Sequence, residues 1–123
     1  MNLVIIDYGS GNLRSVENAF KNTVKTNELK FTIQVTNKLA LISKADHLVL
    51  PGVGSFPDCK KGLLDIEGLI KLLTNEVINK RKKFLGICVG MQILGEGSDE
   101  GECSGLGWIK GRVRKFDITK LVE

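Results

Sequence analysis

The chain has 123 residues, of which 42% are hydrophobic and 26% are charged, and its formal net charge is +4. A chain of this length fits one domain with a real core, and its composition excludes a disordered polypeptide. No apolar run approaches the roughly 18 residues that a membrane-spanning helix needs. The first residues carry no basic leader and no small-residue cleavage site, so we expect no signal peptide and a cytoplasmic location.

Charge and cysteine content predict neither a nucleic-acid site nor a metal site. Lys and Arg are densest at residues 80–83 and 110–115, but few aromatic side chains lie among them, and such clusters are typical of solvated helix ends and strand faces. The three cysteines, Cys59, Cys88 and Cys103, match no zinc-binding spacing, and their odd number argues against a disulfide framework. Free thiols fit a reducing compartment.

Strand-like runs and helical spacing alternate along the chain. The predicted strands are residues 3–6, 31–35, 47–50 and 83–87. The predicted helices are one that begins near Leu13 behind an Asn12 or Ser10 cap, and then residues 39–42, 59–80 and 89–95. Gly68 is the point where the third of these helices can divide. Residues 97–105 are interpreted as a loop and residues 107–116 as extended structure.

Strands that alternate with helices predict an α/β fold with a mainly parallel sheet and helices on both faces. In such sheets the functional residues gather in loops at the carboxyl ends of the strands. Three segments qualify: DYGSGN after the first strand, PGVGSF after the third, and the turn around Cys88 after the fourth. We expect all three to lie along one edge of the sheet.

The stretch from Phe84 to Glu96 places Cys88 between two glycines, where an apolar run gives way to a helical pattern. A sharp strand-to-helix turn of this kind exposes a nucleophile, as the Gly-x-Ser-x-Gly turn of hydrolases does. The helix N-terminus favours a thiolate, and the Val89 amide would point toward an oxyanion formed there. The alternative is a buried structural cysteine between two packing glycines.

Two further glycine-rich loops are candidate sites. Residues 51–54 offer closely spaced backbone amides suited to a second oxyanion donor, although a plain turn has the same composition. Residues 9–11 match the start of a dinucleotide fingerprint, but Arg14 stands where the third glycine belongs, so we predict no nucleotide site. Cys59 and Cys103, in a helical segment and a polar loop, are interpreted as structural.

Four motifs occur in order along nearly the whole chain, namely DYGSGN, LPGVGSF, GICVGMQ and GLGWIKGRV. Together they resemble the class I (triad) glutamine amidotransferases. Within that family the resemblance is strongest to the branch that serves imidazole glycerol phosphate synthase in histidine biosynthesis. It implies a flavodoxin-like glutaminase fold, truncated at its C-terminal side, with residues 1–123 as the N-terminal part of a single glutaminase domain.

The resemblance also implies a reaction and a role for particular residues. Cys88 would attack the side-chain amide of glutamine, release ammonia and form a thioester that water hydrolyses to glutamate. The other implied roles are backbone oxyanion-hole donors (Val53, Val89), substrate contacts (Gly52, Gln92, Glu100) and a partner-facing edge (Tyr8, Asn12). The ammonia would pass to a cyclase subunit, a barrel enzyme that builds the imidazole ring. No metal or cofactor is implied.

The triad of this family also needs a histidine and a glutamate, which its members carry in the last part of the domain. His47, the single histidine of this chain, is predicted to open the third strand, roughly 16 Å from the Cys88 edge at about 3.3 Å per residue. We therefore interpret His47 as structural and expect the 123-residue chain alone to show little or no glutaminase turnover. We also expect an exposed apolar flank and an open strand edge.

Several alternatives remain open at this level. Related amidotransferase subunits serve sugar modification for surface polysaccharides, and a non-catalytic module that docks on the cyclase would carry the same motifs. A small nucleotide- or flavin-binding α/β protein is disfavoured by the broken glycine fingerprint. The length of the chain is compatible with an incomplete sequence, an interrupted gene or a short protein.

Overall fold

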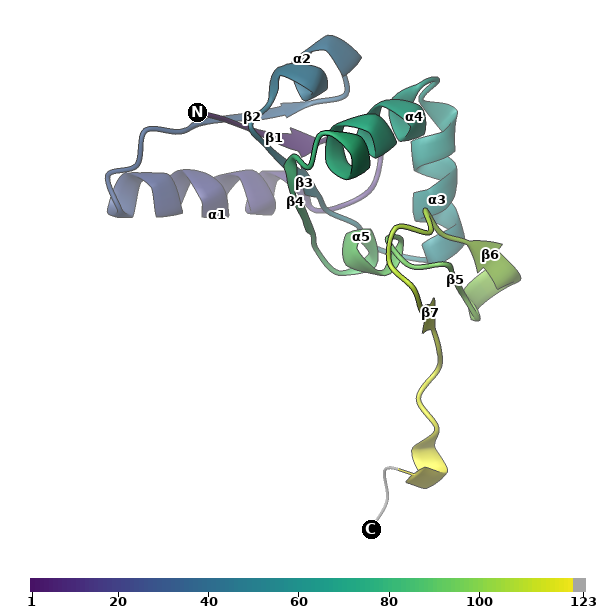
Figure 1. Ribbon diagram of the computed structural model, residues 1–123. Helices are drawn as coiled ribbons and strands as arrows, with labels where there is room; N and C mark the ends of the chain where they lie inside the picture. Colours follow the sequence, from purple (N-terminus) through teal and green to yellow (C-terminus); the bar gives the residue numbers. More distant parts are fainter. Residues whose placement is uncertain (121–123) are drawn as a thin grey trace.

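The computed structural model describes residues 1–120. Its centre is a parallel sheet of four strands, β1 (Asn2–Ile6), β2 (Thr32–Thr36), β3 (His47–Leu50) and β4 (Lys83–Gly86), in the order β2-β1-β3-β4 (Figure 1). In its registers Ile5 lies beside Val35 and Val49, and Val49 lies beside Leu85. The predicted α/β fold with a parallel sheet is confirmed.

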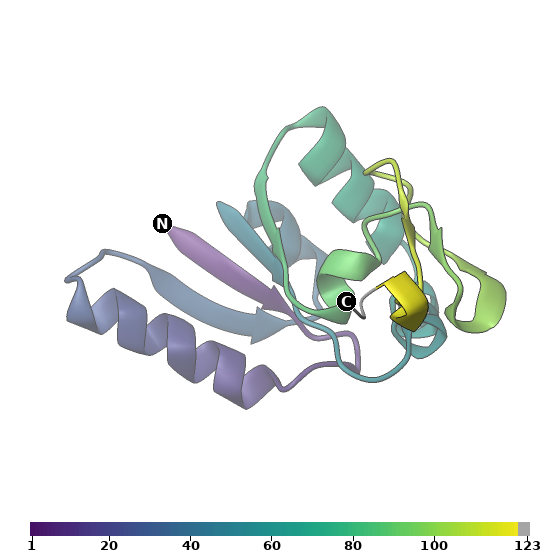
Figure 2. The same ribbon diagram turned by 90° about the horizontal axis from the view of Figure 1, so that it is seen from below.

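Helices cover both faces of this sheet. One face carries α1 (Leu13–Thr26), and the other carries α2 (Leu39–Lys44), α3 (Phe56–Asp65), α4 (Leu69–Thr74) and α5 (Val89–Gln92), as Figures 1 and 2 show. Because successive strand side chains point to opposite faces, Leu3 and Ile5 pack toward α1, whereas Val4 and Ile6 pack into the larger core on the other side. None of the helices in the described part of the chain has both the length and the apolar composition needed to cross a membrane.

The helical segment predicted over residues 59–80 is three elements in the structure. The first, α3, ends at Asp65, and the chain turns at Gly68 before α4. Gly68 has φ +79°, a left-handed conformation that glycine adopts most readily, so the predicted division at this position is confirmed. After α4 the chain continues as a π-helix over Asn75–Asn79. The helix predicted over residues 89–95 is regular only over its first four residues.

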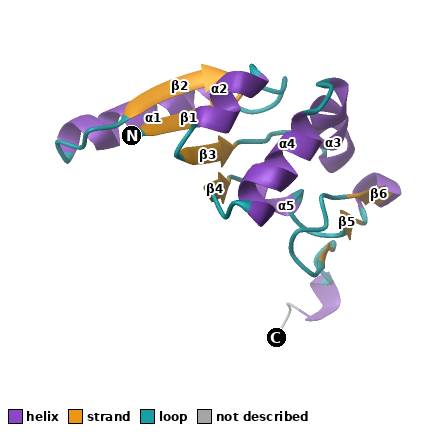
Figure 3. Ribbon diagram, turned by 45° about the horizontal axis from the view of Figure 1, so that its top comes forward, coloured by secondary structure: helices purple, strands orange, loops and turns teal. Residues whose placement is uncertain are grey.

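A small second sheet was not predicted. Its strands β5 (Gly97–Ser98), β6 (Cys103–Ser104) and β7 (Arg112–Val113) lie in the order β6-β5-β7, with 3₁₀ turns at Glu100–Glu102 and Ile118–Lys120 (Figure 3). Strands of two residues carry no hydrophobic alternation, so they leave no pattern to detect. Lys60 on α3 ties this sheet to the body, because its ammonium donates to the carbonyl oxygens of Ser104 (2.9 Å) and Gly105 (3.2 Å).

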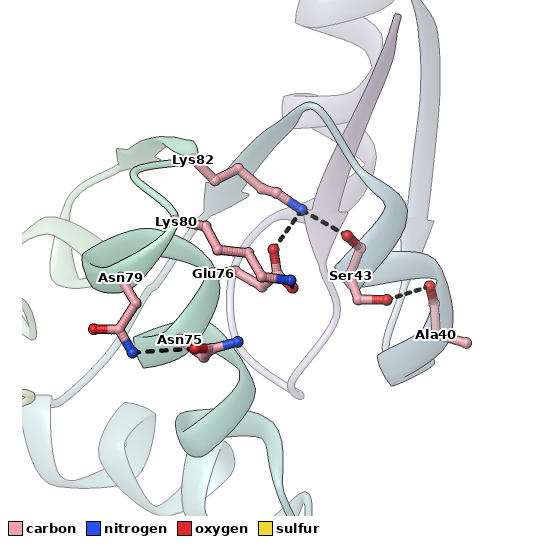
Figure 4. Close-up of polar contacts among 7 residues, drawn as sticks. All are labelled: Ala40, Ser43, Asn75, Glu76, Asn79, Lys80 and Lys82. Carbon is pink, nitrogen blue, oxygen red and sulfur yellow. Dashed lines mark hydrogen bonds and ion pairs between the residues drawn. The ribbon is translucent and has the colours of Figure 1, made fainter.

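A buried carboxylate fixes the start of β4. The Glu76 side chain is 3% exposed, and its two oxygens lie 3.0 Å from the ammonium groups of Lys80 and Lys82. Lys82 also donates to the carbonyl oxygen of Ser43 at 2.7 Å (Figure 4). This cluster ties the π-helix and the residue before β4 to α2, which lies more than 30 residues earlier in the sequence.

The flank of the sheet at β4 is open among the described residues. β4 is an edge strand with β3 as its one neighbour, and Leu85 at its centre is 49% exposed. Beside it, Val16 and Phe20 of α1 line a shallow apolar groove with Ile87. The exposed apolar flank and open edge expected from the sequence are therefore present in this structure.

The Glu76 cluster gives a stability prediction. We expect Glu76→Gln to lower the free energy of unfolding by about 1–3 kcal/mol at neutral pH, because Lys82 loses its anionic partner. Burial raises the pKa of Glu76, but hydrogen bonds from Lys82 and Lys80 outweigh it and hold that pKa below its ordinary value of 4.5. The carboxylate's contribution is therefore complete above about pH 4.5 and is lost as the pH falls through the lower folded-state pKa.

Urea unfolding of both proteins between about pH 3 and pH 7 measures this difference. The matched control is Asp65→Asn, which breaks an exposed pair with Lys61 and is expected to change little. Equal losses in the two variants, or a loss that does not depend on pH, would contradict the assignment.

The open flank gives a second prediction. We expect Leu85→Thr to reduce self-association in sedimentation experiments while leaving stability nearly unchanged, since half of this side chain is already in water and threonine suits a strand. Leu48→Thr on the neighbouring strand is the control; Leu48 is 1% exposed, and its loss should cost about 2–5 kcal/mol. If the Leu85 variant self-associates as much as the unmodified chain, this flank does not drive association.

Candidate active site around Cys88

Cys88 forms the turn between β4 and α5. Its backbone has φ 57° and ψ −121°, an uncommon conformation for a residue other than glycine, and its side chain is exposed. Non-glycine residues in such conformations cost of order 1–3 kcal/mol and cluster at functional sites. The strained, exposed position is the one predicted for a nucleophile, and the alternative of a buried structural cysteine is contradicted by the exposure of the thiol.

Two glycines, Gly52 and Gly90, bring the turn against the end of β3 and the loop after it, and Gly86 lets the turn pack against β4. A Cβ built on Gly90 would overlap the carbonyl oxygen of Leu50, and one on Gly52 would lie 2.6 Å from the Gly90 nitrogen and 3.1 Å from the Val89 carbonyl carbon. A Cβ on Gly86 would lie 2.7 Å from the Gly90 oxygen. The two segments are therefore in direct backbone contact, which places Gly52 beside the Cys88 turn as the sequence predicted.

Most backbone N–H groups of the turn already donate hydrogen bonds within the turn. The Gly90 N–H donates to the carbonyl oxygen of Ile87 at 3.0 Å. The N–H groups of Met91 and Gln92 donate to the carbonyl oxygen of Cys88 at 3.0 and 3.2 Å. The Val89 N–H, in contrast, has no hydrogen-bond acceptor in the described part of the chain. The predicted oxyanion donor is thus unpaired next to Cys88, and the helix behind it is shorter than predicted.

The second predicted oxyanion donor is engaged elsewhere. Val53 N–H donates to the hydroxyl oxygen of Ser10 at 3.1 Å, and the sulfur of Cys59 lies 3.0 Å from the same hydroxyl oxygen. Cys59 is fully buried, as expected of a structural thiol. Sequence reasoning did not connect Ser10, Val53 and Cys59, because the first lies more than 40 residues from the other two and no local pattern joins them.

Of the two residues predicted for a partner-facing edge, the structure buries one and exposes the other. Tyr8 is 4% exposed and its hydroxyl donates to the Pro51 carbonyl oxygen. Burial raises the pKa of the Tyr8 phenol, and nearby Cys59 adds to this rise, so the hydroxyl stays a neutral donor. Asn12 is exposed, and its side chain caps α1 by accepting from Ser15 N–H at 3.5 Å. On this loop Gly9 and Asn12 are therefore exposed, whereas the Tyr8 side chain is not available at the surface.

Gln92 and Glu100, the side chains predicted to contact substrate, lie together. Both line a cavity of about 400 Å³ whose other lining residues are Ser98, Asp99, Val113, Arg114 and Lys115. One carboxylate oxygen of Glu100 also accepts from the Phe56 N–H at 2.8 Å, at the start of α3. Glu100 therefore joins the 3₁₀ turn of the small sheet to the start of α3 besides lining the cavity. Cys88 is not among the residues that line it.

No imidazole lies beside Cys88 in the described part of the chain. His47 opens β3, as predicted, where its ring lies 5.2 Å from that of Phe31, so it occupies the opposite end of the sheet. Between residues 1 and 120 there is also no group of three or more histidine, cysteine, aspartate or glutamate side chains that could hold a metal ion. The turn after β4 therefore presents an exposed thiol on a strained backbone and an unpaired amide, without an imidazole from the described residues.

Comparison with known proteins agrees with this geometry. The family model described as "Glutamine amidotransferase class-I" matches residues 4–102, which include all three loops at the carboxyl edge of the sheet. The chain belongs to the class I glutamine amidotransferase family. The family resemblance and the fold predicted from the sequence are both confirmed by this match.

Relatives in three bacteria carry the same name, imidazole glycerol phosphate synthase subunit HisH. The protein of Brucella suis biovar 1 (strain 1330) is 44% identical over 117 residues, 94% of this chain and 54% of its own length. That of Pelagibacter ubique (strain HTCC1062) is 46% identical over 118 residues, 95% of this chain and 55% of its own. That of Rhodopseudomonas palustris (strain ATCC BAA-98 / CGA009) is 44% identical over 117 residues. The chain thus spans about half the length of the curated relatives it matches.

The backbone contact at Gly90 yields a prediction. Gly90→Ala should destabilise the fold by about 2 kcal/mol or more and disorder the Cys88 turn, because its methyl group would meet the Leu50 carbonyl and nothing flexible can yield. Gly9→Asn is the control, since Gly9 has φ +86° with open space around it and asparagine tolerates that conformation. Thermal unfolding of both variants compares them; similar melting temperatures would contradict the close packing.

Proposed function

We propose that residues 1–123 correspond to the N-terminal part of a single glutaminase domain, which hydrolyses glutamine to glutamate and ammonia. The observation that carries this proposal is the strained, exposed Cys88, in a turn whose next two residues are in direct backbone contact with the glycine-rich loop after β3. Membership of the class I glutamine amidotransferase family supports the same chemistry.

In the proposed reaction the Cys88 thiolate attacks the side-chain amide carbon of glutamine. The tetrahedral oxyanion accepts a hydrogen bond from Val89 N–H, and from Val53 N–H when that amide is available. Proton transfer to nitrogen then releases ammonia and leaves a thioester, which water hydrolyses to glutamate. Gln92 and Glu100 are proposed to hold the amino-acid end of the substrate, which suits a pocket that contains groups able to bind both its ammonium and its carboxylate.

Ammonia is proposed to pass to a cyclase subunit, as part of imidazole glycerol phosphate synthase in histidine biosynthesis. The support is the name shared by relatives that are 44–46% identical to this chain. We propose that Gly9 and Asn12, at the carboxyl edge beside the site, face that subunit in a heterodimer. Three free thiols suit a reducing compartment, so we place the protein in the cytoplasm.

The general base is the remaining requirement. His47 lies at the far end of β3, so the imidazole of the proposed triad, with its glutamate, has to come from polypeptide other than residues 1–120. We therefore expect the 123-residue polypeptide to turn over glutamine about 10²–10⁴-fold more slowly than an enzyme with a complete triad, the range that a general base contributes. A rate like that of a complete triad enzyme would contradict this assignment.

Reaction of Cys88 with a glutamine-shaped electrophile tests the function. We expect an α-chloroketone analogue of glutamine to add once to the chain, with peptide mapping placing it on Cys88, and excess glutamine to slow the reaction. Cys88→Ser should abolish the labelling, whereas Cys103→Ser, which removes a partly buried thiol, should not change it. Labelling that is insensitive to glutamine, or shared equally with Cys103, would favour a non-catalytic partner-binding protein.

A further inference from the structure

The Arg112 side chain lies along the segment that leads to Glu100 and contacts three successive residues of it. Its Nε–H donates to the Asp99 carboxylate at 2.9 Å, and its Nη2 group donates to the Ser98 carbonyl oxygen at 2.8 Å. A Cβ on Gly97 would lie 2.7 Å from Arg112 Nη1, so the guanidinium lies across a residue that has no side chain. All three nitrogens of the guanidinium therefore lie against this segment.

Backbone pairing in the small sheet places Arg112 beside this segment. β7 runs parallel to β5, with Arg112 beside Gly97 (Figure 1). One residue beyond β5, the Asp99 N–H donates to the Val113 carbonyl oxygen at 3.0 Å. Each of these strands has only two residues, so backbone hydrogen bonds alone hold the segment at few points. The side chain of Arg112 adds contacts that this short pairing lacks.

Ser98 connects Arg112 to Glu100. Ser98 is 2% exposed, its carbonyl oxygen accepts from Arg112, and its hydroxyl oxygen accepts from the Glu100 N–H at 3.0 Å. Glu100 lines the cavity with Gln92, and one of its carboxylate oxygens accepts from the Phe56 N–H. Within the described part of the chain no hydrogen bond occupies its other carboxylate oxygen. That oxygen is left for a cationic ligand in the cavity.

The two carboxylates of the cavity, Asp99 and Glu100, differ in their pairing. Arg112 forms an ion pair with Asp99, whereas Glu100 forms none among the described residues. The Arg112 and Asp99 side chains are 41% and 51% exposed, and exposed pairs of this kind contribute little to the stability of a fold. The contact therefore serves the order of the segment and leaves Glu100 as the unpaired carboxylate of the cavity.

We propose that Arg112 is a positioning residue for substrate binding, which fixes the segment before Glu100 so that this carboxylate receives the α-ammonium group of glutamine. The inference rests on the proposed glutaminase function. Arg112 does not line the cavity, so it acts through Glu100. Because the guanidinium orders the segment before substrate arrives, substrate binding does not have to order it.

The test uses Arg112→Lys, which keeps the positive charge. A lysine has one nitrogen and cannot bind the Asp99 carboxylate and the Ser98 carbonyl in the same fork geometry. The matched control is Arg81→Lys, the same exchange at an exposed arginine before β4 that does not line the cavity.

Two probes are compared by the rate of Cys88 labelling over a range of probe concentrations. One is the α-chloroketone analogue of glutamine, and the other is the same chloroketone with hydrogen in place of the α-ammonium group. In both reactions the Cys88 sulfur bonds to the chloromethyl carbon, chloride leaves with its electron pair, and the thiol proton passes to water. Hydrogen exchange of the Glu100 amide, followed by nuclear magnetic resonance, is measured alongside.

We expect Arg112→Lys to raise the half-saturating concentration of the glutamine analogue about fivefold, the size of one ordinary hydrogen bond, without changing its limiting rate. Both values should stay unchanged for the probe that lacks the ammonium group. The Glu100 amide should exchange faster, because the segment that presents its acceptor is less ordered. Arg81→Lys should match the unmodified chain in every measurement.

A double variant shows whether Arg112 acts through Glu100. Glu100→Gln alone should weaken binding of the glutamine analogue, and adding Arg112→Lys to it should weaken binding no further, because the contact that Arg112 positions is already lost. Losses that add in the double variant would overturn the proposal.

Three other outcomes also count against it. An unchanged half-saturating concentration of the glutamine analogue in Arg112→Lys would overturn the inference and leave the glutaminase function standing. An equal rise for both probes would do the same, because Arg112 would then support the cavity in general and not its ammonium site. If neither probe labels Cys88 of the unmodified chain, the glutaminase function fails and the inference fails with it.

Discussion

Direct backbone contact between the loop after β3 and the turn after β4 is the constraint on which this site depends. The contact is possible because Gly52 and Gly90 have no side chain where the two segments meet. The Ile87 N–H continues the strand pairing to the Leu50 carbonyl oxygen at 3.0 Å, so the segments stay in register up to the turn. The chain then reverses at Cys88 in a strained conformation that projects the thiol outward.

The body of the domain holds this arrangement from both ends of β4. At the beginning of the strand, buried Glu76 pairs with Lys82, and Lys82 reaches across to the Ser43 carbonyl on α2. At its end, Val89 and Ile93 pack into the core beneath the turn. Strain at a single residue persists only where its surroundings over-determine the backbone, and here anchoring by charge at one end and by apolar packing at the other supplies that condition.

The described residues combine three features near the turn after β4. These are an exposed thiol at Cys88, an unpaired N–H at Val89 and a cavity lined in part by Gln92 and Glu100. His47 lies far from this turn, at the amino end of β3. The open flank at Leu85 lies on β4, the strand that leads directly to Cys88. Polypeptide packed on that flank would therefore lie close to the thiol.

The sequence by itself determined whatever local patterns encode: the four strands, a cap at Asn12 or Ser10, the break at Gly68 and the cysteine turn, since hydrophobic periodicity and glycine conformation act over a few residues. It also placed three loops at one edge, because parallel strands end together. Only the tertiary structure decided that Val53 N–H is held by Ser10, that Tyr8 is buried under Pro51, that Glu100 binds Phe56, and that short strands near residues 97–113 form a sheet. Each of these joins residues that the sequence separates and packing alone brings together, so no local pattern records them.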